Sequence, residues 1–243
     1  MHAVARLRAQ RLARSSKPFT ARGGSRLAHC PGCRLVLSHC CCALRQTWLT
    51  QAGFCLLMHD IEPLKPSNTG WLVADIVADT YAFGWARTQV AAPLLALLQD
   101  PCWQPYLVFP GEDVAPERLR HDLATPAPAR RPLFLLLDGT WAEARKMFRH
   151  SPYLESLPVL HLQGAAPSQY RLRHSPQAGH WCTSEVAARC LALAGDTQAG
   201  AALQVWLDLF CERYARARDQ LPPEPDSAAQ QQWQRLQAVS TGA

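Results

Sequence analysis

The chain has 243 residues, of which 48% are hydrophobic and 18% charged, which suits one compact domain with a sizeable core. No apolar run approaches the roughly 18 residues that a membrane-spanning helix needs, and no apolar segment follows the basic amino terminus as in a secretory signal. We therefore expect a soluble, cytoplasmic protein that has no membrane partner and no evident obligate protein partner.

The formal net charge of +6 is unevenly distributed. The first acidic residue is Asp60, so residues 1–59 carry +9 and the rest of the chain carries −3. A basic segment on a mildly acidic body favours a phosphate-rich partner, because Lys and Arg displace the counterions condensed on nucleic acid. A solubilising basic tail and an Arg-rich mitochondrial leader are the alternatives.

Five of the ten cysteines lie within residues 30–42, with the spacing Cys30-x2-Cys33-x6-Cys40-x-Cys42. A tight turn between the first two converges their side chains, and four thiolates complete a closed, structural zinc site. We therefore expect these four to bind zinc and Cys41 to point away. A disulfide and a redox CxxC pair are the alternatives.

After this cluster, short apolar strands alternate with helices. In chain order, strands are expected at 54–58, 106–109, 133–137 and 159–162, and helices at 71–82, 92–98, 142–150, 185–193 and 201–218. The residues from Pro222 onward are polar and are expected to be frayed. Such alternation predicts an α/β fold with a mostly parallel sheet covered by helices on both faces.

Polar residues follow three of the predicted strands, at 59–60, 110–113 and 138–141. In open parallel sheets, ligands bind at the carboxyl ends of the strands. In the last cluster, Gly139 permits a close approach of the backbone, and the free N–H groups of the following helix suit a carboxylate. The alternative is that Asp138 and Thr140 are ordinary helix caps and Trp141 belongs to the core.

Three further segments have two interpretations each. The turn at 66–70 either binds phosphate or caps a helix. The segment 170–173 offers two arginines for phosphate contacts or is a solvated edge strand. Glu185 either complements the dipole of its helix or holds a cofactor amino group or ribose.

Taken together and in this order, the segments resemble the DTW-domain family, and within it the bacterial tRNA-uridine aminocarboxypropyltransferases. The resemblance extends from about Leu7 to about Tyr214. It is carried by the basic leader 7–11, the four cysteines, and the segments 54–58, 62–70, 137–141, 143–149, 170–173 and 182–187. Three places depart from the family pattern. Trp71 stands where a basic residue is expected, Ala142 stands where a proline is expected, and the segment after Phe109-Pro110 differs from the family.

The resemblance implies a SPOUT-like fold with a C-terminal trefoil knot, S-adenosylmethionine as cofactor and tRNA as substrate. The implied reaction moves the 3-amino-3-carboxypropyl group to N3 of a variable-loop uridine. The chain then divides into a basic segment with a zinc knuckle (1–48), a SPOUT-like DTW catalytic domain (49–220) and a polar tail (221–243). A methyltransferase on the same fold and a non-catalytic zinc RNA-binding protein are the alternative functions.

The same resemblance assigns roles to individual residues. Asp138 is expected as general base or orienting group, because uridine N3 must lose a proton to attack well. Trp141 is expected to pack against the adenine or the uracil. The expected cofactor-binding residues are Pro110, Asp138, Gly139, Thr140, Trp141, Thr183 and Glu185, and the expected substrate-binding residues are Asn68, Thr69, Arg171 and Arg173.

Overall fold

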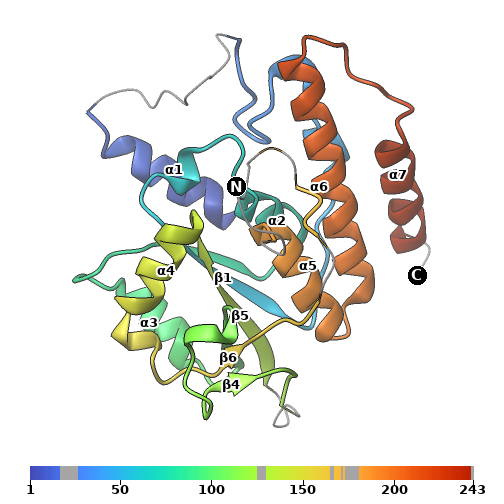
Figure 1. The fold of residues 1–243 in the computed structure, drawn as a ribbon. Helices are drawn as coiled ribbons and strands as arrows, with labels where there is room; N and C mark the ends of the chain where they lie inside the picture. Colours follow the sequence, from blue (N-terminus) through green and yellow to red (C-terminus); the bar gives the residue numbers. More distant parts are fainter. Residues whose placement is uncertain (17–26, 125–129, 165–166, 171, 173–180, 242–243) are drawn as a thin grey trace.

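The computed structural model describes residues 1–16, 27–124, 130–164, 167–170, 172 and 181–241 (Figure 1). Across this described part, the strands form one sheet in the order β2-β1-β5-β3-β6-β4, and all neighbouring pairs are parallel. The strands are β1 (Gly53–Met58), β2 (Thr80–Gly84), β3 (Trp103–Val108), β4 (Leu119–Arg120), β5 (Arg131–Asp138) and β6 (Val159–Leu160). The predicted α/β architecture with a parallel sheet is confirmed.

Helices cover both faces of the sheet (Figure 1). The α-helices are α1 (Ala3–Ala13), α2 (Gly70–Ile76), α3 (Ala92–Gln99), α4 (Trp141–Arg149), α5 (Thr183–Leu193), α6 (Thr197–Arg218) and α7 (Ala228–Thr241). Short 3-10 segments are η1 (Leu37–His39), η2 (Cys42–Leu44), η3 (Glu62–Leu64), η4 (Gly111–Asp113) and η5 (Pro152–Leu154). In the described ranges, no helix combines the length and apolarity needed to cross a bilayer.

Two hydrophobic cores lie on opposite faces of the sheet, and β1 contributes to both. Phe54, Leu56 and Met58 pack into the core that includes buried residues of α2, α5 and α6. Cys55 and Leu57 pack into the core that includes residues of α3 and α4. This division follows from the two-residue period of a strand, and it explains why β1 reads as a continuous apolar run.

The helix predicted at 71–82 is wrong in its second half. α2 ends at Ile76, and residues from Thr80 pair in parallel with β1 as the edge strand β2. The Thr80 hydroxyl donates a 2.8 Å hydrogen bond to the Val77 carbonyl and fixes the turn between the two elements. Thr, Tyr and Phe suit a pleated surface, and the neighbouring β1 supplies the hydrogen-bonding partners that local pattern does not reveal.

The segment after Pro222 was expected to be frayed, and this expectation is also wrong. Residues 228–241 form α7, which runs beside α6 (Figure 1). Trp233 is fully buried, with its ring 4.9 Å from that of Trp206 and 5.4 Å from that of Trp48. One large aromatic side chain therefore docks an otherwise polar helix.

Candidate functional site

The four cysteines predicted as metal ligands converge in the structure. The sulfurs of Cys30, Cys33, Cys40 and Cys42 all lie within 4.8 Å of one another. Sulfur–sulfur distances are 3.4 Å for Cys40–Cys30, 3.6 Å for Cys30–Cys42 and 3.8 Å for Cys33–Cys40. A tetrahedral zinc ion with Zn–S bonds of about 2.3 Å places its sulfurs about 3.8 Å apart, so the set fits zinc. We call this set the cysteine cluster.

Cys41 lies outside the cysteine cluster but contacts it. Its thiol is 1% exposed and hydrogen-bonds to the sulfur of Cys33. This hydrogen bond is the largest factor lowering the pKa of Cys33 to about 4, and together with burial it raises the pKa of Cys41. Cys41 is therefore a protonated donor that stabilises a neighbouring thiolate.

Asp138 ends β5 and is 2% exposed, at the carboxyl edge of the sheet. Its Oδ2 accepts a 2.7 Å hydrogen bond from the amide of Asn68, and its Oδ1 accepts a 2.7 Å hydrogen bond from the hydroxyl of Thr183. Asn68 precedes α2, and Thr183 is the first residue of α5. Three segments far apart in the sequence thus fix the orientation of one carboxylate.

The Asn68 amide joins Asp138 to a second buried acid. Its nitrogen also donates to Glu62 Oε1 at 3.1 Å, and Glu62 is 0% exposed and paired through Oε2 with Lys65 Nζ at 2.5 Å. The side-chain oxygen Oδ1 of Asn68 accepts from the backbone N–H of Trp71 at 2.9 Å. Sequence reasoning assigned no role to Glu62. The signal available was an acid within a segment of turn residues that matches the family pattern.

At the start of α4, the helix-cap interpretation of segment 138–141 is confirmed for Thr140. Thr140 is the N-cap, since its side chain accepts from the N–H of Glu143 at 3.3 Å while Glu143 Oε2 accepts from the N–H of Thr140 at 2.7 Å. Glu143 Oε1 also lies 3.1 Å from Nδ1 of His59, the residue that follows β1. Asp138 is not the N-cap of α4, and Trp141 is half-buried.

A family model described as the DTW domain matches residues 27–215, which is most of the chain. The chain belongs to the DTW-domain family. The chain is also 34% identical over 103 residues to a Drosophila melanogaster protein named tRNA-uridine aminocarboxypropyltransferase 2. This match covers 42% of the chain and spans only 38% of that relative's length. No solved structure matches the chain.

The remaining predicted site residues take different places in the DTW domain. Thr69 is 4% exposed, and its hydroxyl hydrogen-bonds to the thiol of Cys182. Pro110 is half-buried after β3, the strand that pairs with β5. Gly139 follows Asp138 and faces the side chains of Glu143 and His59. Arg171 and Arg173 lie outside the described residues.

Glu185 is 5% exposed and accepts three hydrogen bonds of 2.7 Å. They come from the Ser168 hydroxyl and from the N–H groups of Gln169 and Cys182. Glu185 therefore ties residues 168–169 to the start of α5. The next residue, Tyr170, donates from its hydroxyl to the Ser67 carbonyl at 2.5 Å and so closes this loop over the turn that carries Asn68.

Trp71, which departs from the family pattern, is 1% exposed and contributes nothing to the surface. Its indole N–H donates to the Gly32 carbonyl at 3.1 Å, and the guanidinium of buried Arg34 lies 4.4 Å from its ring centre. Burial lowers the pKa of Arg34 to about 10. Trp71 thus connects α2, the helix that follows Asn68, to the segment of the cysteine cluster.

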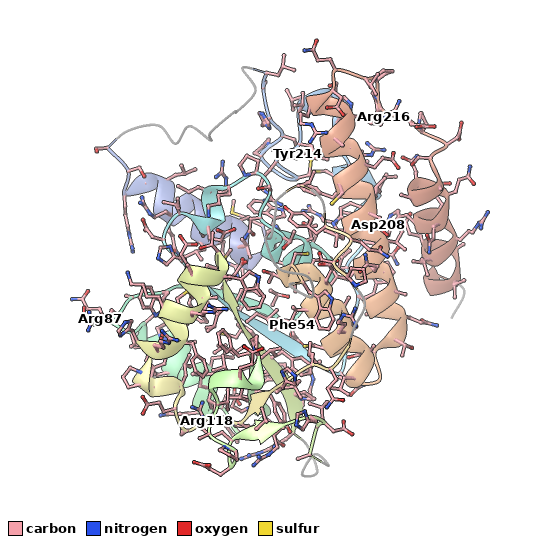
Figure 2. All side chains as sticks on the ribbon, in the orientation of Figure 1. Phe54, Arg87, Arg118, Asp208, Tyr214 and Arg216 are labelled. Carbon is pink, nitrogen blue, oxygen red and sulfur yellow. The ribbon has the colours of Figure 1, made fainter. Side chains whose placement is uncertain are left out.

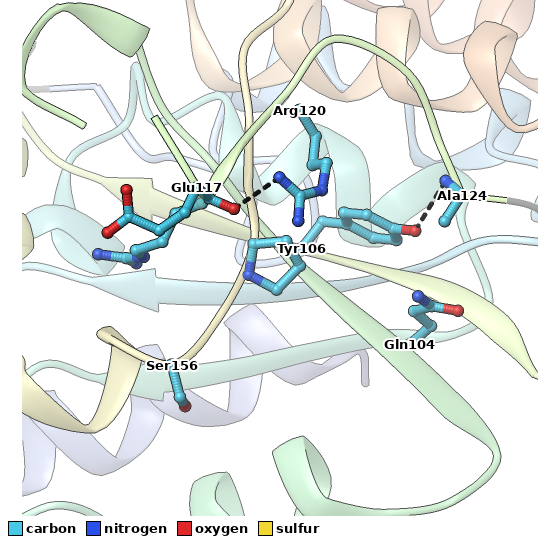
Figure 3. A pocket seen from close by; sticks show the side chains of 8 residues that line it. Gln104, Tyr106, Glu117, Arg120, Ala124 and Ser156 are labelled. Atoms are coloured by element: carbon cyan, nitrogen blue, oxygen red, sulfur yellow. Dashed lines mark hydrogen bonds between the residues drawn. The ribbon is translucent and has the colours of Figure 1, made fainter. Parts of the chain in front are cut away.

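A pocket of about 270 Å³ lies away from this site, between β3, β4 and the start of β6 (Figure 3). Tyr106, in its lining, pairs with Phe134, four positions before Asp138 on β5. Two polar side chains in its lining already have hydrogen-bond partners. The Tyr106 hydroxyl accepts from the Ala124 N–H at 3.2 Å, and the Arg120 guanidinium donates to the Glu117 carbonyl at 2.8 Å. The pocket faces the amino ends of the strands and is not part of the Asp138 site.

Proposed function

We propose that this DTW-domain protein transfers the 3-amino-3-carboxypropyl group of S-adenosylmethionine to N3 of a variable-loop uridine in tRNA. The observation that carries the proposal is the buried carboxylate of Asp138, which is held from two sides at the carboxyl edge of the sheet. The name of the Drosophila relative supports the same reaction class. The proposal includes the SPOUT-like knotted fold and the cytoplasmic location that the family resemblance implies.

The residues proposed to hold the cofactor surround Asp138 in the sheet or in sequence: Pro110, Gly139, Thr140, Trp141, Thr183 and Glu185. Bound S-adenosylmethionine supplies a sulfonium with three electrophilic carbons, and the carbon in line with the nucleophile reacts. Trp141 offers a flat surface for the adenine or the uracil. Glu185 acts by fixing residues 168–169 and the start of α5, because its carboxylate already accepts three hydrogen bonds.

Asp138 is proposed to act on the uridine as the orienting group or the base at N3. Hydrogen bonds from Asn68 and Thr183 already occupy one site on each oxygen and restrict rotation of the carboxylate, which supports the orienting role. Asn68 contributes by positioning Asp138, and Thr69 by its contact with Cys182. Arg171 and Arg173 are proposed to contact tRNA phosphates or the cofactor carboxylate.

The reaction is tested by incubating the zinc-loaded protein with an unmodified elongator tRNA and cofactor labelled either in the carboxypropyl carbons or in the methyl group. We expect carboxypropyl label in the tRNA, on a uridine nucleoside identified by mass spectrometry. Transfer of the methyl label instead would assign the methyltransferase alternative.

The matched variant is Asp138→Asn, which preserves the shape of the side chain and removes its charge. We expect transfer to fall about 100-fold or more, which is the range for losing a positioned acid–base group. An unchanged rate in Asp138→Asn would remove Asp138 from the mechanism. No label transfer by the wild-type protein, together with tRNA binding that responds only to Cys30→Ser or Arg8→Ala, would favour the non-catalytic RNA-binding alternative.

A further inference from the structure

The outward face of α4 is a row of cations. Ala144 and Met147 are buried against the sheet, whereas Arg145, Lys146 and Arg149 are exposed on the opposite side. Arg145 and Arg149 stand four residues apart, a spacing at which like charges destabilise a helix by a few tenths of a kcal/mol. The helix dipole favours the two cations of the last turn, Lys146 and Arg149, but it does not account for Arg145.

The cationic row continues onto the loop that follows β2. Trp85 is half-buried, its ring stacks on His59 with a centroid distance of 5.9 Å, and Lys146 Nζ lies 5.8 Å from its ring centre. Two residues later, Arg87 is exposed at the margin of the molecule (Figure 2). We call Trp85, Arg87, Arg145, Lys146 and Arg149 the α4 face. It combines cations with an aromatic ring, the two features that bind phosphates and bases in RNA.

The α4 face begins directly beside the Asp138 site. His59, on which Trp85 stacks, donates its backbone N–H to the Asp138 carbonyl at 2.9 Å. The same His59 pairs with Glu143, so the nearest acid on α4 is engaged in the N-terminal cap and in this pair. RNA phosphates bound on the α4 face would therefore lie next to the carboxyl edge where the reacting base must sit.

We propose that the α4 face docks the sugar–phosphate backbone of the substrate tRNA beside the Asp138 site. The identity of the RNA rests on the proposed function. The surface itself rests on the geometry of α4 and of the loop that follows β2. Charge complementarity selects the occupant, because the exposed side of α4 presents cations at positions 145, 146 and 149.

The test is the salt dependence of binding of an unmodified tRNA transcript to the full-length protein. The variants are Arg145→Ala/Lys146→Ala and the charge reversal Arg145→Glu/Lys146→Glu, with Arg235→Glu on α7 as an exposed control. We expect the reversal to weaken tRNA binding at least tenfold at low salt. The alanine pair should lower the steepness of log affinity against log salt by roughly 1.4 to 1.8, because each lost phosphate contact removes about 0.7 to 0.9.

S-adenosylmethionine binding, measured without RNA, should be unchanged in all variants. The docking proposal would be wrong if both double variants bound tRNA with the same affinity and the same salt slope as Arg235→Glu.

The docking proposal and the proposed transfer reaction can fail separately. If the double variants lose tRNA binding while the wild type transfers no label, the α4 face stands and the proposed reaction falls. If the wild type transfers label and the double variants match it at low tRNA concentration, the reaction stands and the α4 face falls.

Discussion

Asp138 is held not only by hydrogen bonds but also by the absence of a side chain beside it. A methyl group built on Gly70 overlaps Asp138 Oδ2 and lies 3.2 Å from Asp138 Cγ and 3.4 Å from Asn68 Oδ1. Gly70 is the first residue of α2, directly after the turn that carries Asn68. The turn therefore needs glycine for close approach to the carboxylate, independent of any phosphate binding.

We predict that Gly70→Ala destabilises the protein by about 1–3 kcal/mol, the usual cost of overpacking. The helix-propensity gain of about 1 kcal/mol applies to helix interiors, so at the first residue of α2 it offsets little of this cost. Transfer should fall at least tenfold even in folded protein. Chemical denaturation and the tRNA transfer assay measure the two effects.

Gly84→Ala is the matched control, since its added methyl meets only Leu7 Cδ1 at 3.9 Å, an ordinary contact. Equal stability and activity in the Gly70 and Gly84 variants would show that close approach at Gly70 is unimportant.

At the scale of elements, hydrogen bonds connect the region of the cysteine cluster with the turn that carries Asn68. Trp71 donates to the carbonyl of Gly32, which lies between Cys30 and Cys33, and Arg34, next to Cys33, donates to the Lys65 carbonyl at 3.1 Å. Arg213 on α6 donates to the Cys40 carbonyl at 3.0 Å. The cluster thus connects the turn before α2 with the long helix α6. Metal binding contributes to folding energy in such closed sites, so it also stabilises the position of Asn68.

For the cysteine cluster, we predict that Cys41→Ala weakens zinc binding about 10- to 100-fold, because partners that hydrogen-bond to ligands tune metal affinity on this scale. Cys41→Ser, which keeps a donor, should recover most of the loss. Competition with a metal-chelating indicator measures the affinity. Cys211→Ala on α6 serves as control, and a Cys41→Ala variant with the affinity of this control would exclude a role for the thiol.

At the scale of the whole molecule, α7 extends the protein beyond the matched DTW domain. The family match ends at residue 215, and α7 begins at Ala228. Its contacts are with α6 and with the segment after the cysteine cluster, including a 2.8 Å hydrogen bond from the Trp233 indole to the Leu44 carbonyl. This helix stabilises the side of the molecule formed by α6 and contributes no residue to the Asp138 site.

We predict that Trp233→Ala lowers the free energy of unfolding by about 3–5 kcal/mol, the usual cost of deleting a buried Trp or Phe side chain. Because the contacts described for α7 are with α6 and the segment after the cysteine cluster, transfer by the folded variant should keep its wild-type rate at low temperature. Val239→Ala, at a position 60% exposed on the same helix, should change stability by less than about 0.5 kcal/mol. Equal unfolding midpoints for the two variants would contradict the docking role of Trp233.

The sequence by itself determined the features that depend on local pattern. The spacing from Cys30 to Cys42 indicated the metal cluster, and the apolar runs that became β1 and β5 indicated buried parallel strands. The edge strand β2 and the docked helix α7 were missed, because the first depends on pairing with β1 and the second on a single buried tryptophan.

Only the tertiary structure decided what surrounds Asp138. Its partners Asn68 and Thr183 lie 70 and 45 positions away in the chain, and Glu62 enters only through Asn68. No local period or spacing relates these residues, since parallel strand order and the packing of α2 and α5 bring them together. The motif at 138–141 marks the place of the site, and long-range hydrogen bonds give its carboxylate a fixed orientation.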